Sequence, residues 1–85
     1  MKSFEYTIKD ELGIHARPAG LFVKEAAAFP CKVIIEKDGK EADAKRIFGV
    51  MGLGVKCGEE ITVCTDGENE EAASAAIEAF LKANL

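Results

Sequence analysis

The chain has 85 residues, a formal net charge of −4 and a hydrophobic content of 48%. This length accommodates one domain, which we place at residues 1–85, and the hydrophobic content indicates a globular fold rather than a disordered chain. The acidic balance, with no tryptophan and a single tyrosine, argues against nucleic acid as a partner.

The sequence also indicates the cellular compartment in which the protein is expected. The opening residues lack the apolar segment of a signal peptide, and no apolar run approaches the roughly 20 residues of a membrane span, so we expect a cytoplasmic protein without direct membrane insertion. Cys31, Cys57 and Cys64 are odd in number and lack C-x-x-C spacing, which favours reduced, half-buried side chains over disulfides. With a single histidine, neither a metal nor a cofactor is expected.

The first part of the chain predicts a strand and then a helix. Apolar residues at positions 4, 6 and 8 alternate with polar ones, a period of two that indicates a half-buried strand. A helix is expected from about Ala16 to Phe29, because Pro18 is compatible with a first turn and Pro30 ends the pattern. The side chains expected to face the core from this helix are Ala19, Phe22, Val23, Ala26 and Ala27.

The middle of the chain predicts a β-hairpin and a short helix. The β-branched run within Lys32–Lys37 favours a strand, Asp38-Gly39 is a strong signal for a two-residue turn, and Lys40–Ala44 would return antiparallel. A short helix is expected from Ile47 to about Leu53, before further glycines interrupt the chain.

The last part predicts a strand and a final helix. Glu60–Thr65 alternates as a strand, and Asp66-Gly67 turns the chain. The helix begins after Asn69, a candidate N-cap, and Glu70 and Glu71 suit the positive end of the helix dipole. Its expected apolar stripe comprises Ala73, Ile77, Phe80, Leu81 and Asn84. The order β-α-β-β-α-β-α, with helices on one face of the sheet, predicts an α+β two-layer sandwich.

The only histidine, His15, lies at the predicted start of the first helix, in the segment Gly13-Ile14-His15-Ala16-Arg17-Pro18-Ala19. A helix N-terminus offers unpaired backbone N–H groups and a partial positive charge, which suit an anion. A neutral imidazole nitrogen is a nucleophile. The anionic product of phosphoryl transfer would be stabilised by the amides of Ala16 and Arg17 and by the Arg17 guanidinium. From spacing alone, a surface histidine without a role is an open alternative.

The segment from Arg46 to Gly54 is the second informative stretch. On a helix, Ile47, Phe48 and Met51 fall within an arc of about 100°, and position 50 and position 53 lie roughly opposite. A short helix buries one face, so we expect Val50 and Leu53 in the core. The Ile47, Phe48 and Met51 face is then exposed and suits partner docking. The alternative is that loops bury both faces.

Other catalytic arrangements lack support. Ser3 and Ser74 have no histidine near them in sequence, so a serine nucleophile is unsupported. Adjacent glutamates point in different directions on either a strand or a helix and make no acid–base pair. The glycines at 49, 52 and 54 are not followed by the Lys-Ser/Thr of a P-loop.

Two segments resemble the HPr family, the histidine-containing phosphocarriers of the bacterial phosphoenolpyruvate:sugar phosphotransferase system. They are the His15 segment and Lys45-Arg46-Ile47-Phe48-Gly49-Val50-Met51-Gly52-Leu53-Gly54. The resemblance implies an open-faced β-sandwich with three helices on one face of a four-stranded antiparallel sheet. It implies that His15 accepts a phosphoryl group on Nδ1 from enzyme I, with Arg17 and first-turn amides in support, and passes it to an enzyme IIA domain. Such a protein is a stoichiometric carrier with a transient phosphohistidine rather than an enzyme, and we expect a monomer.

The resemblance also implies where partners dock. Enzyme I and IIA domains are expected to pack on the exposed face of the short helix, beside the helix that bears His15. The expected docking residues are Gly20, Leu21, Lys24, Arg46, Ile47, Phe48 and Met51.

Arg46 departs from the family pattern. Many HPr proteins of Gram-positive type carry a regulatory serine there, which HPr kinase/phosphorylase modifies, and arginine cannot accept that phosphoryl group. Arg46 also removes an N-cap and places positive charge at a helix N-terminus. A specialised HPr-like protein in a regulatory or dedicated phosphotransfer chain is therefore an alternative. A binding module with a vestigial His15 is a third, which the presence of both His15 and Arg17 disfavours.

Overall fold

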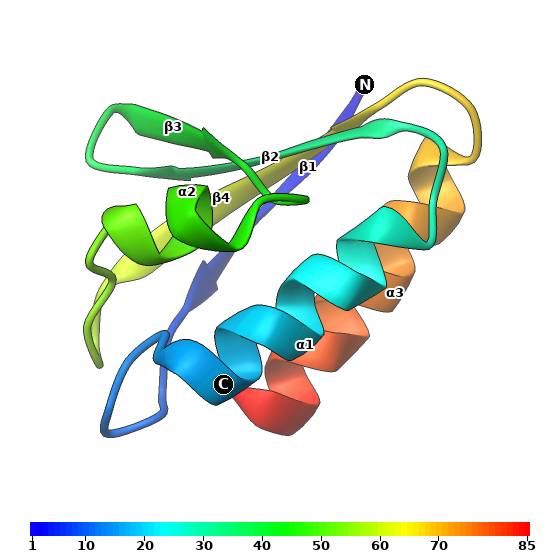
Figure 1. The fold of residues 1–85 in the computed structure, drawn as a ribbon. Coiled ribbons are helices and arrows are strands. Elements are labelled where there is room, and N and C mark those ends of the chain that lie inside the picture. Colours follow the sequence, from blue (N-terminus) through cyan, green and yellow to red (C-terminus); the bar gives the residue numbers. More distant parts are fainter.

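The computed structural model describes residues 1–85 and contains four strands and three helices in the predicted order (Figure 1). The elements are β1 (Lys2–Thr7), α1 (Ala16–Ala27), β2 (Lys32–Lys37), β3 (Lys40–Asp43), α2 (Ile47–Gly52), β4 (Glu60–Asp66) and α3 (Glu70–Asn84).

The four strands form one antiparallel sheet in the order β1-β4-β2-β3. Central strand β4 pairs with both β1 and β2, so that Val63 lies opposite Phe4 on one side and Ile35 on the other. All three helices cover one face of the sheet and the other face is open (Figure 1). The predicted α+β open-faced sandwich is confirmed.

The hydrophobic core lies between the sheet and the helices. Strands contribute every second residue because successive side chains point to opposite faces, as the burial of Ile61, Val63 and Thr65 in β4 shows. Phe22 of α1 and Ile77 of α3 are among the largest buried side chains that meet them. Thr65 is the one buried polar residue, and its hydroxyl donates to the Glu70 carbonyl at 2.9 Å, so no buried side-chain polar atom lacks a partner.

The turn between β2 and β3 is the predicted two-residue turn. Asp38 and Gly39 both have positive φ, 51° and 81°. Positive φ at both central residues is typical of a type I′ turn, whose twist matches that of the two strands.

Two helix ends differ from the predictions. Helix α1 ends at Ala27 rather than Phe29, because the last N–H groups bond three residues back as the chain approaches Pro30, and Ala27 is exposed rather than in the core. Asn69 occupies the N-cap position of α3, but its φ is 63° and its side chain makes no cap bond. Instead, Glu70 accepts a hydrogen bond from the Gly67 N–H at 3.0 Å.

Smaller differences concern strand ends and exposure. β3 ends one residue before Ala44, although Ala44 is buried and donates to the Val33 carbonyl, and β4 runs one residue beyond Thr65. Asn84 is exposed and donates to the Phe80 carbonyl rather than joining the apolar stripe of α3.

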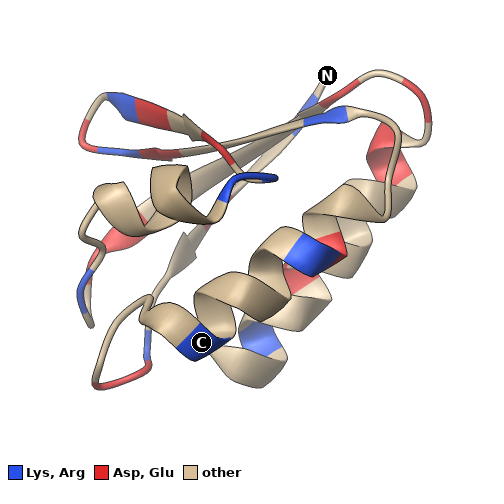
Figure 2. Cartoon of the chain, viewed as in Figure 1, with Lys and Arg blue, Asp and Glu red and all other residues tan.

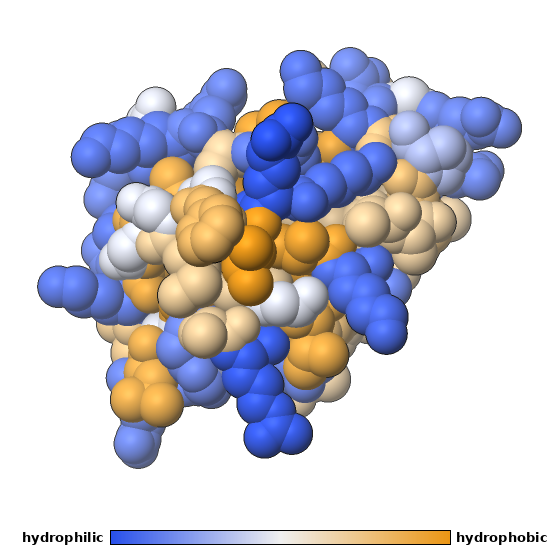
Figure 3. Space-filling view, viewed as in Figure 1, coloured by the Kyte–Doolittle hydropathy of each residue, from blue (hydrophilic) through white to orange (hydrophobic).

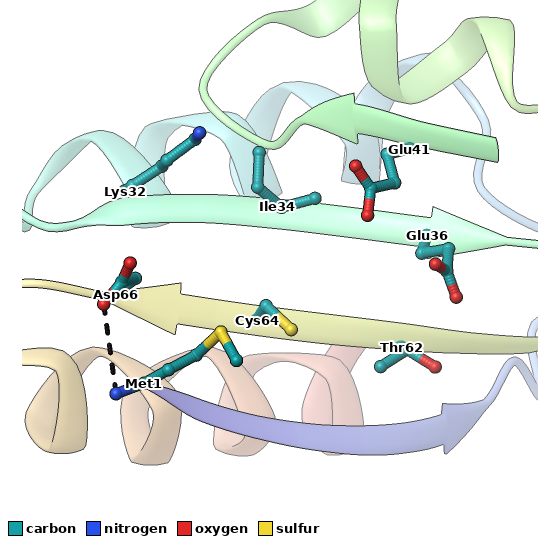
Figure 4. Close-up of a pocket in the computed structure, with 8 residues that line it drawn as sticks. All are labelled: Met1, Lys32, Ile34, Glu36, Glu41, Thr62, Cys64 and Asp66. Carbon is teal, nitrogen blue, oxygen red and sulfur yellow. Dashed lines mark ion pairs between the residues drawn. The ribbon is translucent and has the colours of Figure 1, made fainter. Parts of the chain in front are cut away.

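The open face of the sheet carries a shallow depression of about 220 Å³ (Figure 4). Its lining consists of Met1, Lys32, Ile34, Glu36, Glu41, Thr62, Cys64 and Asp66. Three of these side chains are acids, and Lys32 is the only basic one. The uncovered face is therefore mainly acidic.

The three cysteines differ in environment. All are free thiols, with Cys31 buried, Cys64 half-buried on the open sheet face and Cys57 exposed. The expectation of three half-buried side chains is therefore wrong for Cys57, because it lies in the loop before β4 rather than in a strand or helix.

One lysine ties the end of α2 to the start of β4. The Lys37 Nζ donates to the carbonyls of Leu53 (3.4 Å) and Gly54 (3.1 Å) and forms an ion pair with Glu59 Oε1 at 2.9 Å. Its side chain is only 15% exposed. A cation at the carbonyl end of a helix satisfies groups that have no partner within the helix, so Lys37 fixes the last turn of α2.

We expect Lys37→Met to lower the free energy of unfolding at pH 7 by about 1–3 kcal/mol, because two carbonyls and one carboxylate lose a charged donor. Urea unfolding measures this loss. Lys40→Met is the matched control, since Lys40 is an exposed lysine of the same hairpin with no side-chain partner. It should change stability by less than about 0.5 kcal/mol.

Part of the Lys37→Met effect should depend on pH. The hydrogen bond from Lys37, followed by that from the Lys56 N–H, holds the pKa of Glu59 below its ordinary value. A lowered folded-state pKa contributes stability above the unfolded pKa of about 4.3, and this contribution is lost as the pH falls through the folded pKa. The difference between wild type and Lys37→Met should therefore shrink below about pH 4. A difference that stays constant from pH 7 to pH 3 would contradict the role of Glu59.

Candidate functional site

His15 is held at the start of α1 by the loop that precedes it. The Ile14 N–H donates to the Val55 carbonyl at 3.0 Å, and the His15 carbonyl accepts the first intrahelical bond, from Ala19 at 2.9 Å. Gly13 makes this close approach possible. Its φ is +67°, and a Cβ there would lie 2.3 Å from the Val55 oxygen, so only glycine fits.

The imidazole of His15 is accessible and does not cap its own helix. Its side chain is 36% exposed and makes no cap hydrogen bond. The backbone N–H groups of Ala16 and Arg17 have no acceptor within the chain, and Pro18 has no N–H. The ring therefore stands beside two unpaired donors at the positive end of a 12-residue helix.

Two charged groups flank this helix start. Asp10 Oδ2 lies 3.7 Å from His15 Nε2, and the Arg17 side chain is exposed. Asp10 and Arg17 both line a shallow hollow of about 240 Å³ at this end of α1, together with Pro18, Leu21 and Asn84. Asp10 could not be predicted from the sequence as a neighbour of His15, because nothing in a carboxylate five residues before a histidine indicates that the loop brings the two together.

This arrangement suits phosphoryl chemistry. An accessible imidazole supplies a nucleophile, and a guanidinium and two backbone donors supply partners for phosphate oxygens. No group of three or more histidine, cysteine, aspartate or glutamate side chains lies close enough to hold a metal ion. In phosphoryl transfer, positioning and electrostatic stabilisation make up most of the catalysis, so a small site is sufficient.

The short helix α2 presents an apolar surface. Phe48 is 88% exposed, whereas Val50 is fully buried, as expected for opposite faces. Met51 is exposed on the same side. Ile47 and Leu53 are half-buried and pack against the core, so Ile47 is less exposed, and Leu53 less buried, than predicted.

The apolar surface continues from α2 onto α1 (Figure 3). Leu21 of α1 is 46% exposed. Gly20 is half-buried where α1 meets α2, and a Cβ there would lie 3.8 Å from Ile47 Cδ1. Gly20 therefore belongs to the contact between the two helices rather than to their outer surface. We call the exposed side chains of Leu21, Phe48 and Met51 the apolar patch.

Basic side chains surround the apolar patch. Lys and Arg colour α1 and the loop before α2, whereas the β2–β3 hairpin carries both signs and the start of α3 is acidic (Figure 2). The basic residues on this face include Arg17 and Lys24, both exposed, and Arg46, whose side chain is 81% exposed. The surface around the apolar patch is therefore basic although the whole chain carries a net charge of −4.

Arg46 occupies the N-cap position of α2 without capping it, as predicted. Its Nε lies 3.7 Å from Asp43 Oδ2, and Asp43 Oδ1 accepts the Lys45 N–H at 2.9 Å. The Lys45 ammonium donates to the Phe29 carbonyl at 2.8 Å, which links the start of α2 to the end of α1. The apolar patch and its basic rim are thus held in one arrangement.

Comparisons with known proteins identify the family of this chain. Residues 2–83 match the family model described as "PTS HPr component phosphorylation site". Phosphocarrier protein HPr of Mycoplasma genitalium is 42% identical over 85 residues, which cover 99% of this chain and 97% of the relative. The HPr-like protein Crh of Halalkalibacterium halodurans is 45% identical over 75 residues, covering 88% and 89%.

Solved structures of HPr proteins have the same fold as this chain. A crystal structure of HPr from Thermoanaerobacter tengcongensis superposes with a TM-score of 0.94 at 40% identity, covering 98% of this chain and 93% of that one. None of the three helices of the present chain has both the length and the hydrophobicity that crossing a membrane requires. The family match over nearly the whole chain, with relatives above 40% identity, shows that the chain belongs to the HPr family of phosphocarrier proteins.

Proposed function

We propose that this chain accepts a phosphoryl group on His15 from phosphorylated enzyme I and donates it to the IIA domain of a sugar-specific enzyme II. One observation carries the proposal. An accessible imidazole stands at the start of α1, two residues before the exposed Arg17 and next in sequence to two backbone N–H groups that have no acceptor within the chain. Membership of the HPr family supports the same partners.

The transfer step follows from the site. The Nδ1 lone pair of His15 forms the bond to phosphorus, while the bond between phosphorus and the donor breaks and its electrons stay on the donor. The anionic group then meets the N–H groups of Ala16 and Arg17 and the Arg17 guanidinium, which are complementary to phosphate oxygens. The second transfer reverses these bonds, so the chain is a carrier with a transient phosphohistidine rather than an enzyme.

The apolar patch and its basic rim suit both partners. Enzyme I and the IIA domain would each dock there, with Gly20 and Ile47 supporting the patch and Lys24 and Arg46 at its rim. A positive rim favours partners whose surface is acidic and speeds encounter more than it strengthens the complex. A carrier must leave one partner to reach the next, so a small, partly polar interface is appropriate.

A second candidate function rests on Arg46. Since arginine replaces the regulatory serine of many relatives, the chain could serve a regulatory or dedicated phosphotransfer chain. Similarity alone does not separate the two roles, because HPr and Crh relatives match at 42% and 45% identity. The accessible His15 and the exposed Arg17 at the same end of α1 favour a phosphoryl carrier in either case.

We propose a monomer, since β1 pairs along its whole length with β4 of the same chain. A dimer of HPr from Thermoanaerobacter tengcongensis is among the similar structures. Sedimentation should therefore accompany the transfer assays, so that the carrier species is known.

Incubation with phosphoenolpyruvate and enzyme I should add one acid-labile phosphoryl group to His15. Mass spectrometry measures the incorporation, and His15→Ala should show none. Arg17→Ala should slow transfer by about 10- to 100-fold, because it removes a hydrogen-bond donor to the charged phosphoryl group and raises the transition-state free energy accordingly. If the wild-type chain gains no phosphate under these conditions, the carrier function is wrong.

Phe48→Ala should weaken binding to enzyme I by about 5- to 30-fold, because truncation of an anchoring aromatic side chain commonly costs 1–2 kcal/mol. Its stability should change by less than about 0.5 kcal/mol, since the side chain is 88% exposed. Val50→Ala, on the buried face of α2, is the control and should lower stability instead. Calorimetric titration and urea unfolding separate the two effects, and the opposite pattern would show that the faces are reversed.

HPr kinase and ATP should not phosphorylate a serine of the wild-type chain, because Arg46 occupies the position of the regulatory serine. Arg46→Ser restores a hydroxyl at this position and should become a substrate. Phosphopeptide mapping distinguishes the site. Modification of Ser3 or Ser74 in the wild-type chain would contradict the expectation.

A further inference from the structure

We propose that Asp10 is a positioning residue for His15, whose carboxylate keeps the imidazole proton on Nε2 and so leaves the Nδ1 lone pair available for phosphorus. The inference rests on the proposed function of His15 and adds a residue that the family motif does not contain. Asp10 lies outside the segment from Gly13 to Ala19, and only the folded loop brings it to the ring.

The geometry selects one nitrogen of the ring. Asp10 Oδ2 lies 3.7 Å from His15 Nε2, which is longer than a hydrogen bond, so the carboxylate acts on this nitrogen through its charge. The two side chains are 28% and 36% exposed, so solvent screens their interaction only in part. A neutral imidazole carries its proton on one nitrogen, and a nearby carboxylate favours the tautomer whose N–H faces it.

The loop fixes the carboxylate in this orientation. Asp10 Oδ1 accepts the Leu12 N–H at 2.9 Å, an Asx turn that occupies one of the two oxygens. The Asp10 carbonyl accepts the Gly13 N–H, and its N–H donates to the Leu85 carbonyl, each at 2.9 Å. Asp10 is therefore held by three hydrogen bonds, and the oxygen without a hydrogen-bond partner, Oδ2, is the one nearest the ring.

This arrangement lets the phosphoryl group move without movement of a proton. As Nδ1 bonds to phosphorus and the donor keeps the electrons of the broken bond, the ring gains positive charge and retains its Nε2 proton. The Asp10 carboxylate lies beside that charge, and Arg17 lies at the same end of α1 as a partner for the phosphoryl oxygens. On transfer to the acceptor, the electron pair returns to Nδ1 and the ring leaves as the neutral Nε2–H tautomer.

The ¹⁵N chemical shifts of the His15 ring in the unphosphorylated protein test this directly, because they report which nitrogen carries the proton. Asp10→Asn removes the charge but keeps the oxygen that accepts the Leu12 N–H. We expect the Nδ1–H tautomer to rise in Asp10→Asn and phosphoryl transfer from enzyme I to slow by about two- to fivefold, the effect of a partly exposed ion pair. Glu11→Gln, the neighbouring carboxylate without contact to the ring, should change neither.

Ring shifts that are the same in Asp10→Asn and the wild type would overturn the proposal, even if transfer slows, because a merely structural effect on the loop would slow transfer without changing the tautomer. Asp10→Ser, whose hydroxyl also accepts the Leu12 N–H, repeats the comparison if the amide disturbs the loop. Failure of the proposed function would look different, since the wild type would then gain no phosphate whatever the state of the ring.

Discussion

The contact between the loop before α1 and the loop before β4 determines where His15 lies. The Ile14 N–H bonds to the Val55 carbonyl, and Ile8 exchanges hydrogen bonds with Gly58 and Glu59 in the same pair of loops. These bonds end β1 and begin α1 at a defined point, so the chain enters the helix with His15 as its first flanking residue. Without the close approach that Gly13 allows, the unpaired N–H groups of the first turn would not stand beside the imidazole.

Contacts with the sheet and with α1 hold the six-residue helix α2 in place, so that it can present exposed apolar side chains. A helix this short has little stability of its own. Its start is tied to α1 through Lys45 and Phe29, its end to the sheet through Lys37, and its centre to the core through Val50. These contacts hold α2 with Val50 in the core and Phe48 on its exposed side.

Most of the fold could be predicted from local features of the sequence. Contacts between residues far apart in the chain could not be predicted in this way. The Asp38-Gly39 turn needs only two residues with positive φ. The period-two pattern of β4 indicates which of its side chains are buried, because alternate residues face the core. The start of α1 at His15 follows from Pro18 and the apolar spacing. The Asp10 contact with His15, by contrast, depends on a loop held by the carbonyl of Leu85, 75 positions along the chain, and no sequence pattern reports such a closure. Cys57 was misplaced for a related reason, because a loop residue has no periodicity from which burial can be inferred.

Charge is distributed unevenly over the proposed carrier, so that two of its faces differ in sign although the net charge is negative. The open sheet face is mainly acidic around the depression lined by Glu36, Glu41 and Asp66. The surface around the apolar patch carries the exposed basic side chains of Arg17, Lys24 and Arg46. An acidic partner is therefore attracted to the side where transfer would occur and repelled from the other. Arg46 adds to this polarity, because it places a permanent positive charge where a phosphorylated serine would place a negative one. Serine phosphorylation cannot weaken the proposed docking face at position 46, so in the proposed function the exchange between partners depends on the phosphorylation state of His15.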